Sequence, residues 1–379
     1  MRVADVNFGP KLRIMLFIKS LGQGSAERQC CVLAAQLAKS GHDVCVVIYD
    51  SKAEFYAGLL PAAVKLVSLG HGRWNIPGLL FGLLRQIRSF KPDVLYSFMS
   101  HSNLLAALAG LLAHTTIVYG VRGSGYEHST EPMHARFGEY LHMKSMRIAD
   151  MIIVNSHAAK SELTEDGLLP SKITVIANGI DAERFRFDAT ARAEIRTELG
   201  YSQTDRVIGM FARLHPMKGH ECLLQAFSIT ASQDPNLRLL LIGSGDRSGI
   251  DKLVAGYGLQ GRVTLLEQCQ DIEHYYSAID MYCSASLYGE GFPNALAEAM
   301  ASGHPCIATD VGDSALIISN LGQLLAAGNV QQLSEAISSC PSELNEAQAE
   351  ARRLHIVNNF GLQQLGERTI MALRKTLES

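Results

Sequence analysis

The sequence is poor in charged and aromatic residues and has no excess of either charge. Of its 379 residues, 19% are charged and 7% are aromatic, with a single Trp. Lys and Arg total 34, and Asp and Glu total 37, which gives a formal net charge of −3. Proteins that bind nucleic acid usually carry a strongly basic face, which this composition does not indicate. We therefore expect no nucleic-acid partner.

Metal-binding and disulfide patterns are also missing. The eight cysteines include no Cys-x-x-Cys pair, and most stand in apolar runs, where a free thiol acts as a small hydrophobic side chain. Scattered cysteines in a chain of this length are typical of a reducing compartment. The sequence therefore predicts no metal, no cofactor and a cytoplasmic location.

Long hydrophobic runs are absent as well. The first apolar run, Leu12–Ile18, is too short for a signal peptide or a membrane-spanning helix. The residues before it, Met1–Pro10, include Arg2 and Asp5 and no apolar stretch. We expect that nothing in the chain crosses a membrane.

The sequence does contain a regular alternation of short apolar runs with helical stretches. Hydrophobic residues make up 47% of the chain, and its length suggests two globular domains. Continuously apolar strands alternating with helices are typical of doubly wound parallel sheets. The sequence thus predicts an α/β fold of two Rossmann-like domains. The expected strands include residues 12–18, 44–48, 94–98 and 116–120 in the first domain, and 207–211, 237–242, 281–283 and 305–309 in the second.

The alternation breaks at residues 177–187, where an Asn-Gly turn is followed by a polar helix at 188–199. We place the domain boundary there. The prediction is an N-terminal domain at 1–180, a second domain at 181–360, and a C-terminal helix at 361–379 that packs back on the first domain. Two such domains are expected to face each other across a cleft, with ligands outside the carboxyl ends of the strands.

The most informative segment runs from Tyr288 to Gly312. Strong helix formers follow Pro293, which is suited to the first position of a helix predicted at 293–302. The free backbone N–H groups and the positive end of the helix dipole favour an anion at its start. Gly291 and Asn294 leave room for phosphates there.

Two carboxylates flank this predicted anion site. Glu290 precedes the helix and Glu298 lies on it, with seven residues between them. Carboxylates repel phosphates but accept hydrogen bonds from hydroxyl groups. The pattern indicates a ligand that carries both phosphates and a sugar. Taken singly, either carboxylate is equally well explained as a solvated acid near a helix start.

The segment from Glu290 to Glu298, EGFPNALAE, resembles the E-x7-E signature of retaining glycosyltransferases of the GT-B fold, in the family-4 group. Upstream, Phe211–Gly219 (FARLHPMKG) resembles that family's G-R-L-x-x-x-K-G loop. The resemblance implies two Rossmann-like domains, with a nucleotide sugar bound by the C-terminal domain and an acceptor bound by the N-terminal domain.

The resemblance also implies roles for individual residues. Arg213 and Lys218 would contact the donor diphosphate and balance its charge without a metal. Glu290 would hold hydroxyls of the donor sugar, and Glu298 would hold the ribose. The donor-binding segment between the two carboxylates comprises Gly291, Phe292, Pro293 and Asn294.

Two glycine turns resemble the same family more weakly. Leu241–Asp246 (LIGSGD) is similar to its L-x-G-x-G turn, in which Gly243 and Gly245 would let the backbone approach the nucleotide. Gly22–Glu27 (GQGSAE) is similar to its G-G-x-E loop, in which Gly24 would face the diphosphate. A glycine turn of this kind also opens the dinucleotide site of dehydrogenases, so an NAD-linked dehydrogenase is the alternative.

One feature departs from the family pattern. Many members place a His after a strand of the N-terminal domain, where this chain has Arg122. Arg122 is therefore a candidate for contact with the donor sugar or phosphate, and His101, after the strand ending at Phe98, is a candidate for the cleft wall. Either residue is equally well explained by packing or capping.

The predicted function is transfer of a hexose or N-acetylhexosamine from a UDP-linked sugar to a glycan or lipid-linked glycan, in cell-surface polysaccharide synthesis. A non-catalytic nucleotide-sugar sensor and a sugar-nucleotide epimerase are the alternatives.

The stretch Gly78–Lys91, with Arg73 and Trp74 before it, combines Leu, Phe and Arg residues. It suggests peripheral contact with the inner face of a membrane, although such helices more often pack on a sheet.

Overall fold

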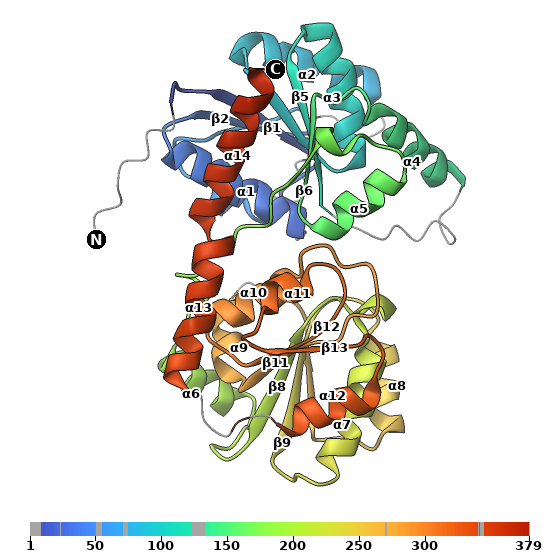
Figure 1. Ribbon diagram of the computed structural model, residues 1–379, viewed down its shortest axis with the longest axis vertical. Helices are drawn as coiled ribbons and strands as arrows, with labels where there is room; N and C mark the ends of the chain where they lie inside the picture. Colours follow the sequence, from blue (N-terminus) through green and yellow to red (C-terminus); the bar gives the residue numbers. More distant parts are fainter. Residues whose placement is uncertain are drawn as a thin grey trace. The chain divides into compact units, whose positions relative to one another are not determined.

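A computed structural model describes residues 9–22, 24–50, 55–70, 75–122, 133–269, 271–339, 341 and 345–378, apart from the side chains of 133–137 and 139. The chain divides into two compact units (Figure 1). Unit 1 comprises Met1–Gly179 and Leu362–Ser379, and unit 2 comprises Ile180–Gly361. Within these described ranges, no helix is both long and apolar enough to span a bilayer.

Unit 1 contains a parallel sheet of seven described strands, in the order β3-β2-β1-β4-β5-β6-β7. The strands are β1 (Arg13–Ile18), β2 (Asp43–Ile48), β3 (Lys65–Ser68), β4 (Val94–Phe98), β5 (Thr116–Val121), β6 (Met151–Val154) and β7 (Ile173–Val175). The α-helices are α1 (Ser25–Lys39), α2 (Ile76–Phe90), α3 (Ser100–Ala113), α4 (Met133–Ser145), α5 (His157–Glu165) and α14 (Leu362–Leu377).

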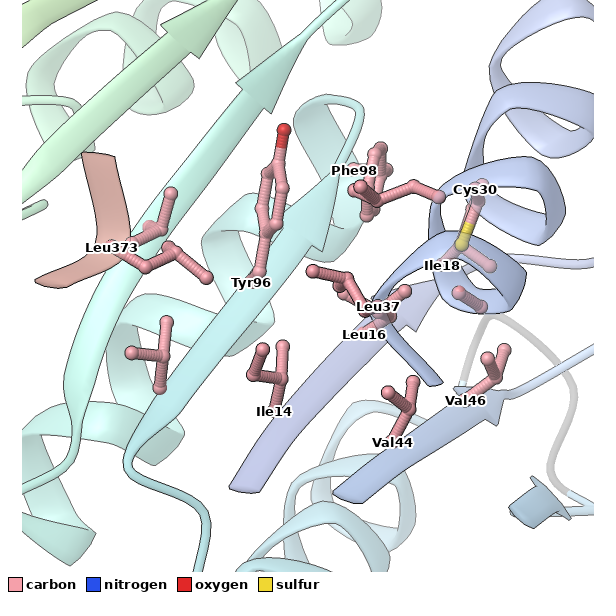
Figure 2. Close-up of a cluster of buried hydrophobic side chains, with 14 of the residues drawn as sticks. Ile14, Leu16, Ile18, Cys30, Leu37, Val44, Val46, Tyr96, Phe98 and Leu373 are labelled. Carbon is pink, nitrogen blue, oxygen red and sulfur yellow. The ribbon is translucent and has the colours of Figure 1, made fainter. Parts of the chain in front are cut away.

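Helices cover both faces of this sheet because both faces are apolar. Along β1, Ile14 and Leu16 pack on one side with residues of α1 and α14, while Met15 and Phe17 pack on the other side with α2 and α3. This alternation explains why the strand reads as a continuous apolar run. Figure 2 shows the first of these layers, in which Leu373 of α14 approaches the sheet.

Unit 2 contains a parallel sheet of six described strands, in the order β10-β9-β8-β11-β12-β13. The strands are β8 (Arg206–Phe211), β9 (Leu237–Ile242), β10 (Val263–Leu266), β11 (Met281–Ser284), β12 (Cys306–Thr309) and β13 (Gln323–Leu325). The α-helices are α6 (Ala189–Glu198), α7 (His220–Ala231), α8 (Arg247–Gly256), α9 (Ile272–Ala278), α10 (Asn294–Ala301), α11 (Ser314–Ile318), α12 (Val330–Ser338) and α13 (Glu346–Phe360).

The strand order of unit 2 fixes where a ligand can bind. β8 and β11 are direct neighbours, and the chain proceeds outward from them in opposite directions. At such a point the loops after the two strands leave the same sheet edge and diverge, which opens a crevice above the carboxyl ends. The loops that follow β8 and β11 are those with the predicted phosphate-binding and carboxylate residues.

The prediction of two doubly wound α/β domains is confirmed, and the predicted strands agree with the observed ones to within a residue or two. The helix predicted at 293–302 is present and is one residue shorter at each end. It spans Asn294–Ala301, and Pro293 is the N-cap with an extended ψ of 92°. Proline fixes only φ, so it serves in the cap as readily as in the first turn.

Candidate functional site

The loop after β8 places Lys218 at the end of a short 3-10 helix, Pro216–Lys218. His215 begins this turn, since its ring Nδ1 accepts from the N–H of Met217 at 3.3 Å. Gly219 ends it with φ +70°, and a Cβ there would lie 2.0 Å from the carbonyl oxygen of Ala285. Only glycine therefore lets this loop pack against the residue that follows β11.

A backbone hydrogen bond also joins the loops after β8 and β11. The N–H of Leu287 donates to the carbonyl of Met217 at 2.7 Å. Together with the close contact at Gly219, this bond fixes Lys218 beside the start of the carboxylate segment. The two loops act as one rigid support.

An ion pair lies at the junction of these loops. Lys218 Nζ donates to Glu290 Oε1, and Ser286 Oγ donates to the same oxygen at 2.6 Å. The side chains of Lys218 and Glu290 are only 17% and 9% exposed, so the pair is shielded from water. A shielded charge pair with a third hydrogen bond holds its geometry closely. Both groups are thus pre-positioned.

The second predicted carboxylate is held by a different hydroxyl. Glu298 lies on α10 and is buried, and its Oε2 is 2.9 Å from the hydroxyl oxygen of Tyr276 on α9. Tyr276 is fully buried, with its ring packed edge-on to Phe211 at the end of β8. This packing fixes the carboxylate of Glu298 relative to the sheet.

The glycine turn after β9 approaches the same support. A Cβ on Gly243 would lie 1.9 Å from the carbonyl oxygen of Ala212, and one on Gly245 would lie 2.5 Å from that of Leu214. The N–H of Leu214 donates to the carbonyl of Ser244 at 2.8 Å. Both glycines are required by backbone packing between the loops after β8 and β9.

The residues between the two carboxylates form the start of α10. Phe292 is buried and its ring packs against Phe360 at 5.3 Å between centroids. The carbonyl of Gly291 accepts from the N–H of Asp313 at 2.9 Å. Pro293 is the N-cap of α10 and makes no side-chain cap bond. The N-terminus of a helix favours an anionic ligand because of its backbone N–H groups and its dipole.

Arg213 differs from the other predicted residues of unit 2 because it is exposed. Its guanidinium contacts the Met217 sulfur at 3.9 Å, and it forms no ion pair within the described part of the chain. The structure thus brings together Lys218 and Glu290, holds Glu298 on the next helix, and leaves Arg213 at the surface of the same loop.

The remaining predicted residues, Gly24, His101 and Arg122, belong to unit 1. Gly24 is the N-cap of α1, and a Cβ there would collide with the carboxylate of Glu27, which folds back on it. Burial raises the pKa of Glu27, although its own backbone N–H and Lys19 act in the opposite direction. Gln23, between Gly22 and Gly24, lies outside the described residues.

Arg122 contacts three side chains of unit 1, two by hydrogen bonds and one by a cation–π interaction. Its guanidinium donates to the hydroxyl of Tyr96 at 2.9 Å and to Asn178 Oδ1 at 3.0 Å, and it lies over the ring of Phe98 at 5.3 Å. Burial raises the pKa of Tyr96, an effect that Arg122 partly offsets. His101 is the exposed second residue of α3. Their part in ligand binding stays a prediction.

Two hydroxyl residues of the site were not predicted from the sequence. Ser286 stands four residues before Glu290, and Tyr276 lies on a separate helix from Glu298. No motif spacing marks them, since their function depends on the packing of α9 and the loop after β11. Across the described ranges, no three His, Cys, Asp or Glu side chains cluster in a way that could hold a metal ion.

Both halves of the chain match models of one kind of protein. Residues 26–184 match the model "Glycosyltransferase Family 4", and residues 191–353 match "Glycosyl transferases group 1". The fold is similar to that of Anabaena HepE, solved in complex with UDP, with a TM-score of 0.80 at 20% identity over 96% of this chain and 100% of that one. The chain belongs to the family-4-type glycosyltransferases, which have the GT-B fold.

Curated relatives carry glycosyltransferase names. The D-inositol 3-phosphate glycosyltransferase of Rhodococcus jostii is 30% identical over 56% of this chain. The chain spans about half (49%) of that relative's length. The Escherichia coli UDP-Gal:alpha-D-GlcNAc-diphosphoundecaprenol alpha-1,3-galactosyltransferase is 25% identical, and the match covers 75% of this chain and 75% of that relative's length.

Proposed function

We propose that this chain transfers a hexose or N-acetylhexosamine, with retention of configuration, from a UDP-linked sugar to a glycan or a lipid-linked glycan. The observation that carries the proposal is the junction of Lys218, Ser286 and Glu290 at the carboxyl ends of neighbouring strands β8 and β11. A cation for phosphate and a carboxylate for hydroxyls are both held there before any ligand arrives.

The donor would lie along this support in a fixed direction. Lys218, Arg213 and the first turn of α10 would bind the diphosphate, Glu290 the sugar hydroxyls, and Glu298 the ribose hydroxyls. HepE has been solved with UDP-glucose, and the Escherichia coli relative is named for UDP-galactose, which supports a uridine nucleotide. Gly243 and Gly245 would let the nucleotide approach the backbone.

The reaction would exchange one C–O bond for another at the anomeric carbon. The bond from the sugar to the β-phosphate oxygen breaks, and its electron pair stays on UDP, where Lys218, Arg213 and the α10 dipole stabilise the charge. The acceptor hydroxyl then attacks from the same face, and its proton passes to the departing phosphate oxygen. Neither a metal nor a side-chain base is needed for this sequence.

The acceptor would be bound by unit 1. The name of the Escherichia coli relative specifies a diphosphoundecaprenol-linked sugar as acceptor, whereas the Rhodococcus relative is named for D-inositol 3-phosphate. We favour the lipid-linked glycan because the Escherichia coli relative matches 75% of both chains, whereas the chain spans 49% of the Rhodococcus relative. Synthesis of a cell-surface polysaccharide on the cytoplasmic side of a membrane is consistent with that acceptor.

A sensor and an epimerase remain the competing functions for the same donor site. A sensor would bind the nucleotide sugar and release it unchanged, whereas an epimerase would convert it to another nucleotide sugar without an acceptor. The family assignment sets the dehydrogenase alternative aside.

Thermal unfolding with a panel of nucleotides and nucleotide sugars tests the proposal. At a hundredfold excess over Kd, a ligand adds about 2.7 kcal/mol of stability, so UDP and UDP-sugars should raise Tm clearly. The Lys218→Ala variant should lose this rise, whereas Lys252→Ala, an exposed lysine on α8, should keep it. An equal rise in the wild type and Lys218→Ala, or none in the wild type, would contradict the proposal.

A further inference from the structure

Three neighbouring helices of unit 1 expose large apolar side chains. On α3, Leu108, Leu111 and Leu112 are 50%, 55% and 61% exposed, although leucine in a globular protein is usually buried. We define the α3 face as these leucines together with four exposed apolar residues from α2, α4 and the turn after α4. Those further members are Phe81, Tyr140, Leu141 and Ile148.

These side chains lie on one side of unit 1. α3 packs against both α2 and α4, and Figure 1 shows α2 and α3 side by side above the sheet. The inward side of α3 is occupied by Leu105, Ala106 and Ala109, which are buried against the sheet. Leu108 and Leu112 are four residues apart, about one helical turn, so they point the same way, away from the sheet.

Basic side chains border the apolar centre on both sides. Exposed Arg85 and Arg88 lie on α2, and exposed Lys144 and Arg147 lie on α4 and just after it. The sequences of α2 and α3 contain neither Asp nor Glu. The sequence of α4 contains one acidic residue, Glu139. An apolar centre with a basic border is complementary to an anionic lipid surface, where phosphates meet acyl chains.

The structure alters the surface suggested by the sequence. Leu79 and Leu83 of the stretch Gly78–Lys91 are core residues that pack on the sheet, and only Phe81 among its large apolar residues is strongly exposed. Arg73 and Trp74 lie outside the described residues. The leucines come from α3, which was not part of the predicted membrane contact.

We propose that the α3 face is a docking surface for an anionic lipid bilayer. The leucines of α3 enter the boundary between headgroups and acyl chains, while the three flanking arginines and Lys144 bind lipid phosphates. This deepens the proposed function, on which it rests, because it places a lipid-linked acceptor beside unit 1.

Vesicle sedimentation of the full chain tests the proposal. Wild type should bind vesicles of phosphatidylcholine with phosphatidylglycerol and bind phosphatidylcholine alone more weakly. Leu108→Gln with Leu112→Gln should lower partitioning by about tenfold or more. Arg85→Gln and Lys144→Gln should each lower binding to the anionic vesicles by about fivefold.

A matched control is available in unit 2. Leu316 and Leu354 are each 47% exposed, so changing both to Gln removes nearly as much exposed apolar surface from other helices as the change of Leu108 and Leu112. This control should bind vesicles like the wild type. Equal loss in the control, or no vesicle binding by the wild type, would overturn the proposal.

Two further measurements separate the possible failures. A dimer in size-exclusion chromatography that the α3 variant converts to a monomer, without vesicle binding, would assign the face to a second copy and overturn the proposal. The UDP-induced rise in Tm should persist in the α3 variant. Loss of that rise in the wild type would instead contradict the donor site, whatever the vesicles show.

Discussion

At the scale of single residues, the candidate site is defined by two hydroxyl groups as much as by its charges. Ser286 donates to Glu290, and the hydroxyl of Tyr276 is within hydrogen-bonding distance of Glu298. When Lys218 turns to a bound diphosphate, Ser286 still holds the carboxylate in place. The Ser286 hydroxyl is therefore expected to contribute most to the binding of ligands that carry a sugar.

The variant Ser286→Ala should weaken binding of UDP-glucose by about tenfold while leaving UDP binding nearly unchanged. A hydrogen bond to a charged group is worth about 1.5–3 kcal/mol, and only the sugar depends on Glu290. Titration calorimetry with both ligands measures the ratio. Ser286→Thr should retain the hydroxyl bond, and Ser284→Ala, two residues earlier, should behave as wild type. An equal loss for UDP and UDP-glucose would refute this role.

The charged residues of the candidate site were predicted from the sequence, but the residues that hold them were not. Lys218, Glu290 and Glu298 stand in motifs with fixed spacing, so they can be recognised without a structure. Tyr276 and Ser286 act through contacts across different elements, which no spacing encodes. Arg122 illustrates the reverse case, since its bonds to Tyr96 and Asn178 depend on tertiary packing.

At the scale of elements, the site is a junction of three loops that pack backbone against backbone. The loop after β8 contacts the loop after β11 at Gly219 and the loop after β9 at Gly243 and Gly245. Glycine at these places has no side chain to separate the loops. The position of Lys218 thus depends on the backbone packing at these three glycines.

The substitution Gly243→Ala should destabilise unit 2 and weaken UDP binding together. Its Cβ would lie 1.9 Å from the carbonyl oxygen of Ala212, so the loop must shift, which costs about 1–3 kcal/mol. Thermal unfolding with and without UDP measures both effects. Gly256→Ala at the end of α8, where a Cβ meets nothing within 4 Å, should change neither. An unchanged Tm in Gly243→Ala would contradict this view of the junction.

The strands were predictable because buried parallel strands are continuously apolar. β13 was missed because Gln323–Leu325 is short and two of its three residues are exposed. α13 was missed because Glu346–Phe360 is mostly polar and buries only Arg352, Ile356 and Phe360. The start of α10 was misplaced because proline suits both the cap and the first turn.

At the scale of the whole molecule, each unit carries its own surface. Unit 2 holds the charged junction at the point where its strand order reverses, and unit 1 holds the α3 face. The two family models match the two parts of the chain separately. Donor binding and membrane binding are therefore expected to be lost independently by mutation.

A crystal structure of the chain soaked with UDP tests the central claim most directly. We predict the diphosphate within hydrogen-bonding distance of Lys218 Nζ and the first turn of α10, with the ribose hydroxyls on Glu298. The Lys218–Glu290 bond should be weakened or broken in that complex. UDP bound elsewhere, or bound with Lys218 and Glu298 both out of contact, would contradict the account.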